Sequence, residues 1–365
     1  MLILIFGGFI LTAHNSLSEQ GITSGFGFLE RGTGWDMGFA FLPTSISDPY
    51  WYTLLMGFLN TVIVGYVAMA FATFIGVGLA GMRISSNPVL NMTALIYVDL
   101  IRNIPPILQV LAWYGLFSTF PAPRQAFQFG ESVFISARGV YMPALNISGY
   151  ATVAIAVIIM VAIGLTLWVG FGKRFTFVSV LRKTAFAGQI VAGAAALIAL
   201  HCIAFRIPDT GLLSFPELKG FNFRGGMSLT PELLTILVAT MIYGSAYVAE
   251  IVRGGILSVD PGKVEAGRAL GMSSWMIFSR IQLPITVQNI LPMMTNLYVW
   301  LIKATTLGIA VGFSDMFAVS VSSINQSGQT IEFILILAAS FWILNNGLVW
   351  ILNGFGARIH RKQAR

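Results

Sequence analysis

The sequence predicts an all-α membrane protein, a polytopic bundle of about eight transmembrane helices. The chain of 365 residues is 56% hydrophobic and only 10% charged, with a mean hydropathy of +0.81, whereas an ordinary soluble domain carries about 25% charged residues. Apolar segments of about 20 residues, the length that crosses a bilayer, recur along the chain. Lysine and arginine are concentrated in alternate loops, as membrane topology requires. A water-soluble globule of this composition would have too few polar residues to cover its surface.

The first element, Met1–Ala13, is apolar but too short to span a membrane alone. No basic region precedes its apolar run, which disfavours a cleaved signal peptide. We therefore expect the start of a first helix to lie upstream of this methionine.

Seven further segments are each long and apolar enough to be spans. In chain order they are Tyr52–Met82, Leu90–Phe120, Ala151–Phe171, Ala185–Phe205, Leu233–Ile256, Ile285–Val311 and Ile331–Leu352. When the loop Val252–Pro284 is placed in the cytoplasm, thirteen loop lysines and arginines lie inside and six lie outside. Because positive charge marks cytoplasmic loops, eight spans with both termini inside form a self-consistent arrangement.

The outer loops are long and rich in Gly, Pro and aromatic residues. The largest are His14–Trp51, Pro121–Ser148 and Ile207–Pro231. They suit either a docking surface for an outside partner or a solvated rim that packs against the helix ends.

Other chemistry has little support in the sequence. The single cysteine, Cys202, excludes an internal disulfide, and the three histidines lack metal-ligand spacing. The basic residues lie between apolar segments rather than on a soluble face, which argues against nucleic-acid binding. We therefore expect no metal, no cofactor and no nucleic-acid partner.

The cytoplasmic stretch Ser258–Pro284 predicts two short helices joined by a turn. Asp260 is suited to cap the first helix and Pro261 to be its first residue. That helix should run to about Leu270 and stop at Gly271, because glycine favours the conformation that follows a helix end.

Ser273 is suited to cap the second helix. Apolar residues recur at helical spacing along it, at Trp275, Phe278 and Ile281. Pro284 then marks the start of the next span. An exposed pair of helices of this kind suits either a docking device or a connector that folds back on the bilayer.

This stretch resembles the coupling-loop signature of ABC importer permeases, in which Glu-Ala-Ala is followed after three residues by Gly and after nine more by Ile-x-Leu-Pro. The matching residues are Glu265, Ala266, Gly267, Gly271, Ile281, Leu283 and Pro284. Gly267 stands where the family usually has alanine, which costs roughly 1 kcal/mol of helix propensity but keeps the position small. The resemblance implies that Glu265, Ala266, Gly267 and Gly271 contact a separate ATPase subunit.

Further motifs resemble the amino-acid branch of this family. They are Gly57, Asn60 and Thr61 in GFLNT, Asp99–Pro105 as an E-x-x-R-x-x-P pattern with aspartate in place of glutamate, and Lys303–Leu307 as K-x-T/S-S-L. The outer sequences FGFLERGTGWD and SISDPYW, and an additional pair of spans between Pro121 and Pro231, are similar to the Q-type permease of general L-amino-acid importers.

The resemblance implies a MetI-like permease core in a bacterial inner membrane, which transports polar or general L-amino acids by alternating access. The implied partners are ABC ATPase subunits, a second homologous permease, a periplasmic amino-acid-binding protein and membrane lipid. The expected parts are 1–50 (the incomplete span and a periplasmic segment), 51–120 (permease core), 121–230 (periplasmic loops with two additional spans), 231–358 (permease core with the coupling loop 258–284) and 359–365 (a basic cytoplasmic tail).

Charges inside the predicted spans mark a candidate translocation path, because a charge in the bilayer is costly unless it is paired or faces water. Asp99 and Arg102 share a helix face. Pro105 and Pro106 follow at once and remove two helix hydrogen bonds, which is tolerated only against protein or a wet cavity.

Lys303 lies in the outer half of its span and is followed by Thr305 and Thr306. We expect Arg102 and Lys303 to meet the carboxylate of a passing amino acid, on a path shared with Asp99, Thr305 and Thr306. The alternative is structural, with Arg102 paired to Asp99 and Lys303 paired to Asp315 or Glu332.

The sequence contains no GxxxxGK[ST] loop, so we expect a non-catalytic subunit whose ATP is hydrolysed by a separate partner. A secondary transporter or channel without an ATPase is the alternative, although the inverted repeats that would favour it are not visible. A membrane enzyme would need acidic, histidine or metal-ligand residues clustered in the spans, and the sequence has no such cluster.

Overall fold

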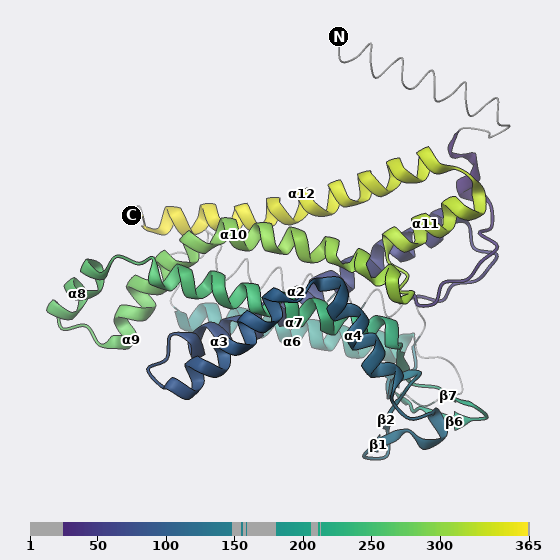
Figure 1. Ribbon diagram of the computed structural model, residues 1–365, viewed down its shortest axis with the longest axis horizontal. Helices are drawn as coiled ribbons and strands as arrows, with labels where there is room; N and C mark the ends of the chain where they lie inside the picture. The colour runs from purple at the N-terminus through teal and green to yellow at the C-terminus, as the bar shows by residue number, and fades with distance from the viewer. Residues whose placement is uncertain are drawn as a thin grey trace, which may run out of the picture. The chain divides into compact units, whose positions relative to one another are not determined.

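The computed structural model describes residues 25–147, 155, 158, 180–205, 211 and 213–363. The chain divides into two compact units. The first comprises Met1–Gly115 and Glu232–Arg365, and the second comprises Leu116–Pro231. The described part of the first unit is helical, while the second combines a helix with short antiparallel strands (Figure 1).

The first unit is built around the long helix α2. Its helical elements are η1 (Phe26–Glu30), α2 (Tyr50–Arg83), α3 (Pro88–Asn103), α4 (Pro106–Ser118), α7 (Pro231–Leu257), α8 (Pro261–Ala269), α9 (Ser274–Ile277), η4 (Phe278–Gln282), α10 (Leu283–Ala304), η5 (Thr305–Val311), α11 (Met316–Ser327) and α12 (Thr330–Gln363). Two apolar clusters share α2: one with α7, α10 and α12, the other with η1, α11 and α12. The helix therefore joins both halves of this unit's core.

Four helices in the described part of the chain are long and apolar enough to cross a membrane. They are Tyr50–Arg83, Pro231–Leu257, Ser274–Val311 and Thr330–Gly354. Each coincides with a predicted span, so the polytopic helical fold is confirmed. α3 and α4 form a fifth if the bent pair is counted as one span.

The predicted count of eight spans stays a prediction. Met1–Ala13 lies outside the described residues, as does nearly all of Ala151–Phe171. The segment Ala185–Phe205 is helical up to Ala204, the last residue of α6 (Val180–Ala204), whose apolar part is Gly188–Ala204.

The predicted span Leu90–Phe120 is broken rather than straight. α3 and α4 meet at an angle of 104° at the two prolines. Proline at 106 begins α4, where a missing backbone N–H costs nothing. Gln109 is buried and donates from Nε2 to the carbonyl oxygens of Ile101, at 2.9 Å, and Ile104, at 3.0 Å. These bonds stabilise backbone groups that the break leaves without helical partners.

The structure adds two features to the predicted elements. α9 ends at Ile277, and a π-helical turn at η4 joins it to α10, which begins at Leu283, so that Ser274–Val311 forms one stretch. The region before the last span, for which the sequence predicted no element, contains α11. Asp315 caps this helix by accepting from the Ala318 N–H at 2.9 Å, and Gly328 ends it with φ +73°.

The second unit contains a sheet that the all-α prediction did not include. Its strands are β1 (Phe127–Phe129), β2 (Val133–Ser136), β3 (Gly139–Met142), β4 (Ala144–Leu145), β5 (Leu213–Ser214), β6 (Glu217–Lys219), β7 (Asn222–Arg224) and β8 (Met227–Leu229). β1, β2, β3 and β8 form an antiparallel sheet in that order, while β4–β5 and β6–β7 are separate pairs. The strands have two to four residues each, too few to produce a clear alternation in the sequence.

Candidate functional site

The helix pair α8–α9 has the capping predicted from the sequence. Asp260 accepts from the Gly262 N–H at 2.9 Å, and Ser273 accepts from the Met276 N–H at 3.3 Å. Gly271 adopts φ +71° in the turn between the helices. The pair lies at one end of the first unit, beyond α7 and α10 (Figure 1). The structure therefore has a compact helix–turn–helix where the sequence predicts one.

Gly267 is the buried residue of α8, and it faces the chain's own second helix. A Cβ at this position would lie 3.1 Å from Ile277 Cγ1 and 3.0 Å from Ile281 Cδ1. The need for a small residue here is thus met by packing within the helix pair. Glu265, Ala266 and Gly271, the other predicted contact residues, are exposed.

Two large apolar side chains beside these residues are also exposed. Leu270 is 81% exposed and Trp275 is 72% exposed. The sequence motif names neither as a contact, although both flank the turn at Gly271. Apolar groups left in water at the tip of a well-capped helix pair are a mark of a protein-binding surface.

Arg102 and Asp99 lie at the end of α3 but do not form the predicted structural pair. Both are exposed, and in the described part of the chain no ion pair joins them. The Arg102 guanidinium lies over the Tyr247 ring of α7, with Cζ 5.1 Å from the ring centroid. A cation–π contact of this kind leaves the guanidinium N–H groups available to an anion.

The Tyr247 ring begins a short row of aromatic side chains. Tyr243 Oη donates to Tyr247 Oη at 2.9 Å, and the two ring centroids are 4.7 Å apart. The Trp300 ring of α10 lies 4.7 Å from Tyr243 on its other side. The row thus links Arg102 on α3, through α7, to α10.

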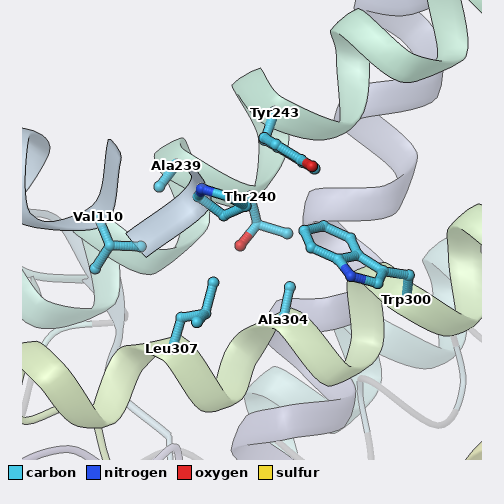
Figure 2. A pocket seen from close by; sticks show the side chains of 8 residues that line it. Val110, Ala239, Thr240, Tyr243, Trp300, Ala304 and Leu307 are labelled. Atoms are coloured by element: carbon cyan, nitrogen blue, oxygen red, sulfur yellow. The ribbon is translucent and has the colours of Figure 1, made fainter. Parts of the chain in front are cut away.

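A shallow pocket opens beside this row, next to the break between α3 and α4 (Figure 2). It is lined by Pro106, Val110, Ala239, Thr240, Tyr243, Trp300, Ala304 and Leu307. Its walls are apolar apart from the Thr240 hydroxyl and the polar edges of the two aromatic rings. Four elements, α4, α7, α10 and η5, contribute to it.

Lys303 and the two threonines after it have different surroundings. Lys303 is exposed and Thr306 is half-buried, and Thr306 donates to the Lys303 carbonyl oxygen at 2.8 Å. Thr305 is fully buried and donates to Ile302 O at 3.0 Å and Asp315 Oδ2 at 3.2 Å. Within the described ranges Lys303 makes no ion pair, with Asp315 or Glu332 or otherwise.

Asp315 belongs to a buried polar cluster that fixes the start of α11. Burial raises its pKa to about 6, although hydrogen bonds from Ala318 N–H and Thr305 lower it. Thr61 Oγ1 accepts from the Met316 N–H at 3.0 Å, and Asn60 Nδ2 donates to the Ser314 carbonyl oxygen at 2.7 Å. The GFLNT residues therefore anchor α11 to α2.

The sequence did not single out one charged cluster of the core. Glu250 of α7 pairs with Arg253 on the same helix and with Arg83, the last residue of α2, at 3.6 Å. The cluster ties the ends of two spans together. Among the described residues, no group of histidine, cysteine, aspartate and glutamate side chains is arranged to hold a metal ion.

Two curated relatives align with nearly the whole chain, and a family model matches its second half. Residues 212–361 match the family of binding-protein-dependent transport system inner membrane components. The putative amino-acid ABC transporter permease protein YhdX of Escherichia coli (strain K12) is 33% identical over 354 residues, 95% of this chain and 88% of that protein. The general L-amino acid transport system permease protein AapQ of Rhizobium johnstonii is 32% identical over 368 residues, 98% of this chain and 90% of that protein. A solved chain titled as an amino acid ABC transporter with histidines has a TM-score of 0.49 and 19% identity, covering 85% of this chain and 95% of that chain.

Proposed function

Because this chain belongs to the family of binding-protein-dependent inner membrane components, the permeases of ABC transporters, we propose that it is the translocation subunit of an ATP-driven importer of L-amino acids. Two relatives that align over nearly their full length are named for amino-acid transport. Their names support the substrate class, and the general L-amino-acid subtype follows AapQ. The chain is non-catalytic in this proposal, and a separate subunit hydrolyses the ATP.

The exposed surface of α8–α9 carries the proposal. Glu265, Ala266 and Gly271 are the residues we assign to the ATPase contact, and Leu270 and Trp275 supply apolar area beside them. Gly267 acts from beneath by letting α8 lie close to α9 and η4. A rigid, capped helix pair can transmit the closing motion of an ATPase into the spans, since α9 continues without a gap into α10.

One such chain forms only half of the wall of a translocation path, and the remaining partners follow from this. We assign it a second, homologous permease, a periplasmic amino-acid-binding protein that delivers the substrate, and the lipid of a bacterial inner membrane. Both termini lie in the cytoplasm in this arrangement, as the loop charges favour. Alternating access then exposes the path between the two permeases to each side in turn.

Arg102 and Lys303 are the residues we place on that path. Both are exposed cations without an ion-pair partner among the described side chains. Arg102 contacts the Tyr247 ring, Tyr247 packs against Tyr243, and Tyr243 lines the apolar pocket. Such a cation suits the carboxylate common to all amino acids. We assign the exposed Asp99 and the half-buried Thr306 to the same path, because Asp99 lies one turn from Arg102 on α3 and Thr306 is bonded to Lys303. Thr305 holds Asp315 instead.

Co-purification tests the docking assignment. A tagged chain expressed with its transport system should retain an ATPase subunit, and Glu265→Lys should release it, because the substitution reverses the charge on the exposed face of α8. Lys263→Glu, an exposed residue of the same helix outside the motif, is the matched control. An intact complex with normal uptake in the Glu265→Lys variant would refute the assignment and favour a secondary transporter or channel.

A further inference from the structure

The sheet of the second unit has two chemically different faces. Residues paired across antiparallel strands point to the same side, so the register sorts the side chains. One face carries Gln128, Phe134, Ser136, Tyr141 and Ser228. The other, here called the open face, carries Phe127, Phe129, Val133, Ile135, Val140, Met142, Met227 and Leu229.

The first face is covered by the β6–β7 hairpin. Phe223 of β7 stacks on Phe134, with ring centroids 4.5 Å apart, and also contacts Tyr141 at 4.9 Å. The Tyr141 hydroxyl donates to Asn222 Oδ1 at 2.7 Å. Tyr141 and Phe223 are buried as a result. The core of the sheet therefore lies on this side.

The open face is entirely apolar, yet none of its eight side chains is buried. Phe127 is 52% exposed, Phe129 60% and Met227 43%. A contiguous apolar surface on a sheet is costly in water, so this face requires a cover.

A short chain connection ties the sheet to a membrane helix. β8 ends at Leu229, two residues before Pro231, the first residue of the membrane helix α7. At the other end, β1 begins nine residues after α4 ends at Ser118. Two extended residues reach only about 7 Å. The end of β8 is therefore held at the level where α7 enters the membrane.

We propose that the open face lies on the membrane surface, with its apolar side chains inserted at the boundary between the lipid headgroups and acyl chains. Apolar faces insert into bilayers in this way, and aromatic side chains such as Phe127 and Phe129 are enriched at that depth. Arg124 and Arg138 contact Phe221 of the covering hairpin, so these cations belong to the covered side of the sheet, away from the lipid.

Lipid surrounds a membrane subunit throughout a transport cycle. A binding protein that docks and leaves would expose the face to water at each release, and the apolar cost would recur. A bilayer covers the face continuously. The proposal concerns the membrane placement of the sheet and is independent of the transported substrate.

Spin labels on neighbouring residues of β1 test this placement. In a Cys202→Ala background, Phe129→Cys carries a label on the open face, and Gln128→Cys carries one on the opposite side. Met227→Cys and Ser228→Cys repeat the comparison on β8. With the full chain in lipid nanodiscs, labels at 129 and 227 should collide several-fold more with oxygen than with a water-soluble nickel chelate, while labels at 128 and 228 should show the reverse preference.

Each other outcome overturns the proposal. Equal water accessibility at 128 and 129 would remove the lipid contact, and a lipid-like signal at both would mean that the sheet is embedded rather than lying on the surface. Protection at 129 only after addition of the binding protein or the second permease would assign the face to a protein. None of these results bears on the ATPase contact, so the proposed function would stand.

Discussion

At the scale of single residues, the candidate path is defined by two cations that form no direct ion pair with a described side chain. The Arg102 guanidinium makes a cation–π contact with Tyr247 and no ion pair with Asp99. Lys303 makes no ion pair with an acidic side chain in the described part of the chain. An unpaired cation near the bilayer is expensive and needs water or an anion. The expected anion is the substrate carboxylate, because Asp315 is held by Thr305 and Glu332 accepts from the Gly25 N–H.

Alanine at either cation should therefore impair transport without loss of the complex. We expect Arg102→Ala and Lys303→Ala each to lower the uptake of labelled amino acid by about tenfold, equivalent to about 1.4 kcal/mol of lost transition-state binding. Arg102→Lys keeps the charge and should retain part of the activity. Normal uptake in both alanine variants, with the assembled complex present, would assign these residues a structural role.

Asp315 should make stability depend on pH. Its folded pKa, about 6, lies above the value of 3.8 expected in the unfolded chain, so folding takes up a proton between these values. The penalty that the ionised carboxylate places on the free energy of unfolding is complete above pH 6. It shrinks as the pH falls from 6 and is lost only below the unfolded value of 3.8.

Asp315→Asn keeps an oxygen to cap α11 and removes the ionisation. We expect it to raise the free energy of unfolding at pH 7.5 by on the order of 1–3 kcal/mol relative to the parent, with a difference only about a third as large at pH 4.5. Thermal unfolding of the purified protein in detergent at both pH values measures this. A constant difference between the two proteins across that range would contradict the raised pKa.

The sequence distinguishes charges better than it distinguishes hydroxyls. A lysine or arginine inside an apolar run is visible from composition alone, so Arg102 and Lys303 can be nominated without coordinates. Thr305 and Thr306 look equivalent in the sequence, yet Thr305 is fully buried against Asp315 and Thr306 is only half-buried. The direction of each threonine side chain depends on the change from α10 to the tighter η5 helix. No residue pattern in the sequence predicts that change.

At the scale of elements, close helix approach depends on glycine at the crossing points. A Cβ at Gly76 of α2 would lie 2.5 Å from Val248 Cβ and 2.7 Å from the Ser245 carbonyl oxygen of α7. Val248 is fully buried and the carbonyl oxygen is part of the backbone, so neither can yield easily. The two helices can therefore keep their present separation only without a side chain at 76.

Gly76→Ala should force α2 and α7 apart. We expect it to lower the free energy of unfolding by about 1–3 kcal/mol, as overpacking of a core does. Gly78→Ala, on the same helix with nothing within 4 Å of an added Cβ, is the matched control and should be neutral or stabilising. Equal thermal stability of the two variants in detergent would show that the helices can separate at no cost.

Long elements could be predicted from the sequence, and short ones could not. Spans such as α2 and α7 follow from their apolar length, and α8 follows from Asp260, Pro261 and Gly271. α11 was missed because its twelve residues lie between two spans and mix serine with apolar side chains. The sheet was missed because its stability comes from pairing between residues as distant as Met142 and Met227.

At the scale of the whole molecule, the chain has a membrane-spanning core, an exposed α8–α9 pair and a unit of short strands, but the sequence has no nucleotide-binding loop. α9 runs through η4 into α10, and α10 carries both Trp300 of the pocket and Lys303. A displacement at α8–α9 therefore has a continuous helical route to the candidate path. This arrangement suits a subunit moved by an external ATPase.

The energy source separates this mechanism from a secondary transporter. In vesicles that contain the whole system, uptake should require ATP on the side of α8–α9, and a partner ATPase made unable to hydrolyse ATP should abolish it. Collapse of the proton gradient with an ionophore should leave uptake unchanged while ATP is maintained, because the proposed cycle takes its free energy from hydrolysis at the docked subunit. A secondary transporter predicts the opposite pair of results.

Leu270→Ser combined with Trp275→Ser should weaken ATP-driven uptake by removing apolar contact area at the tip, whereas uptake by a proton-coupled carrier would not change.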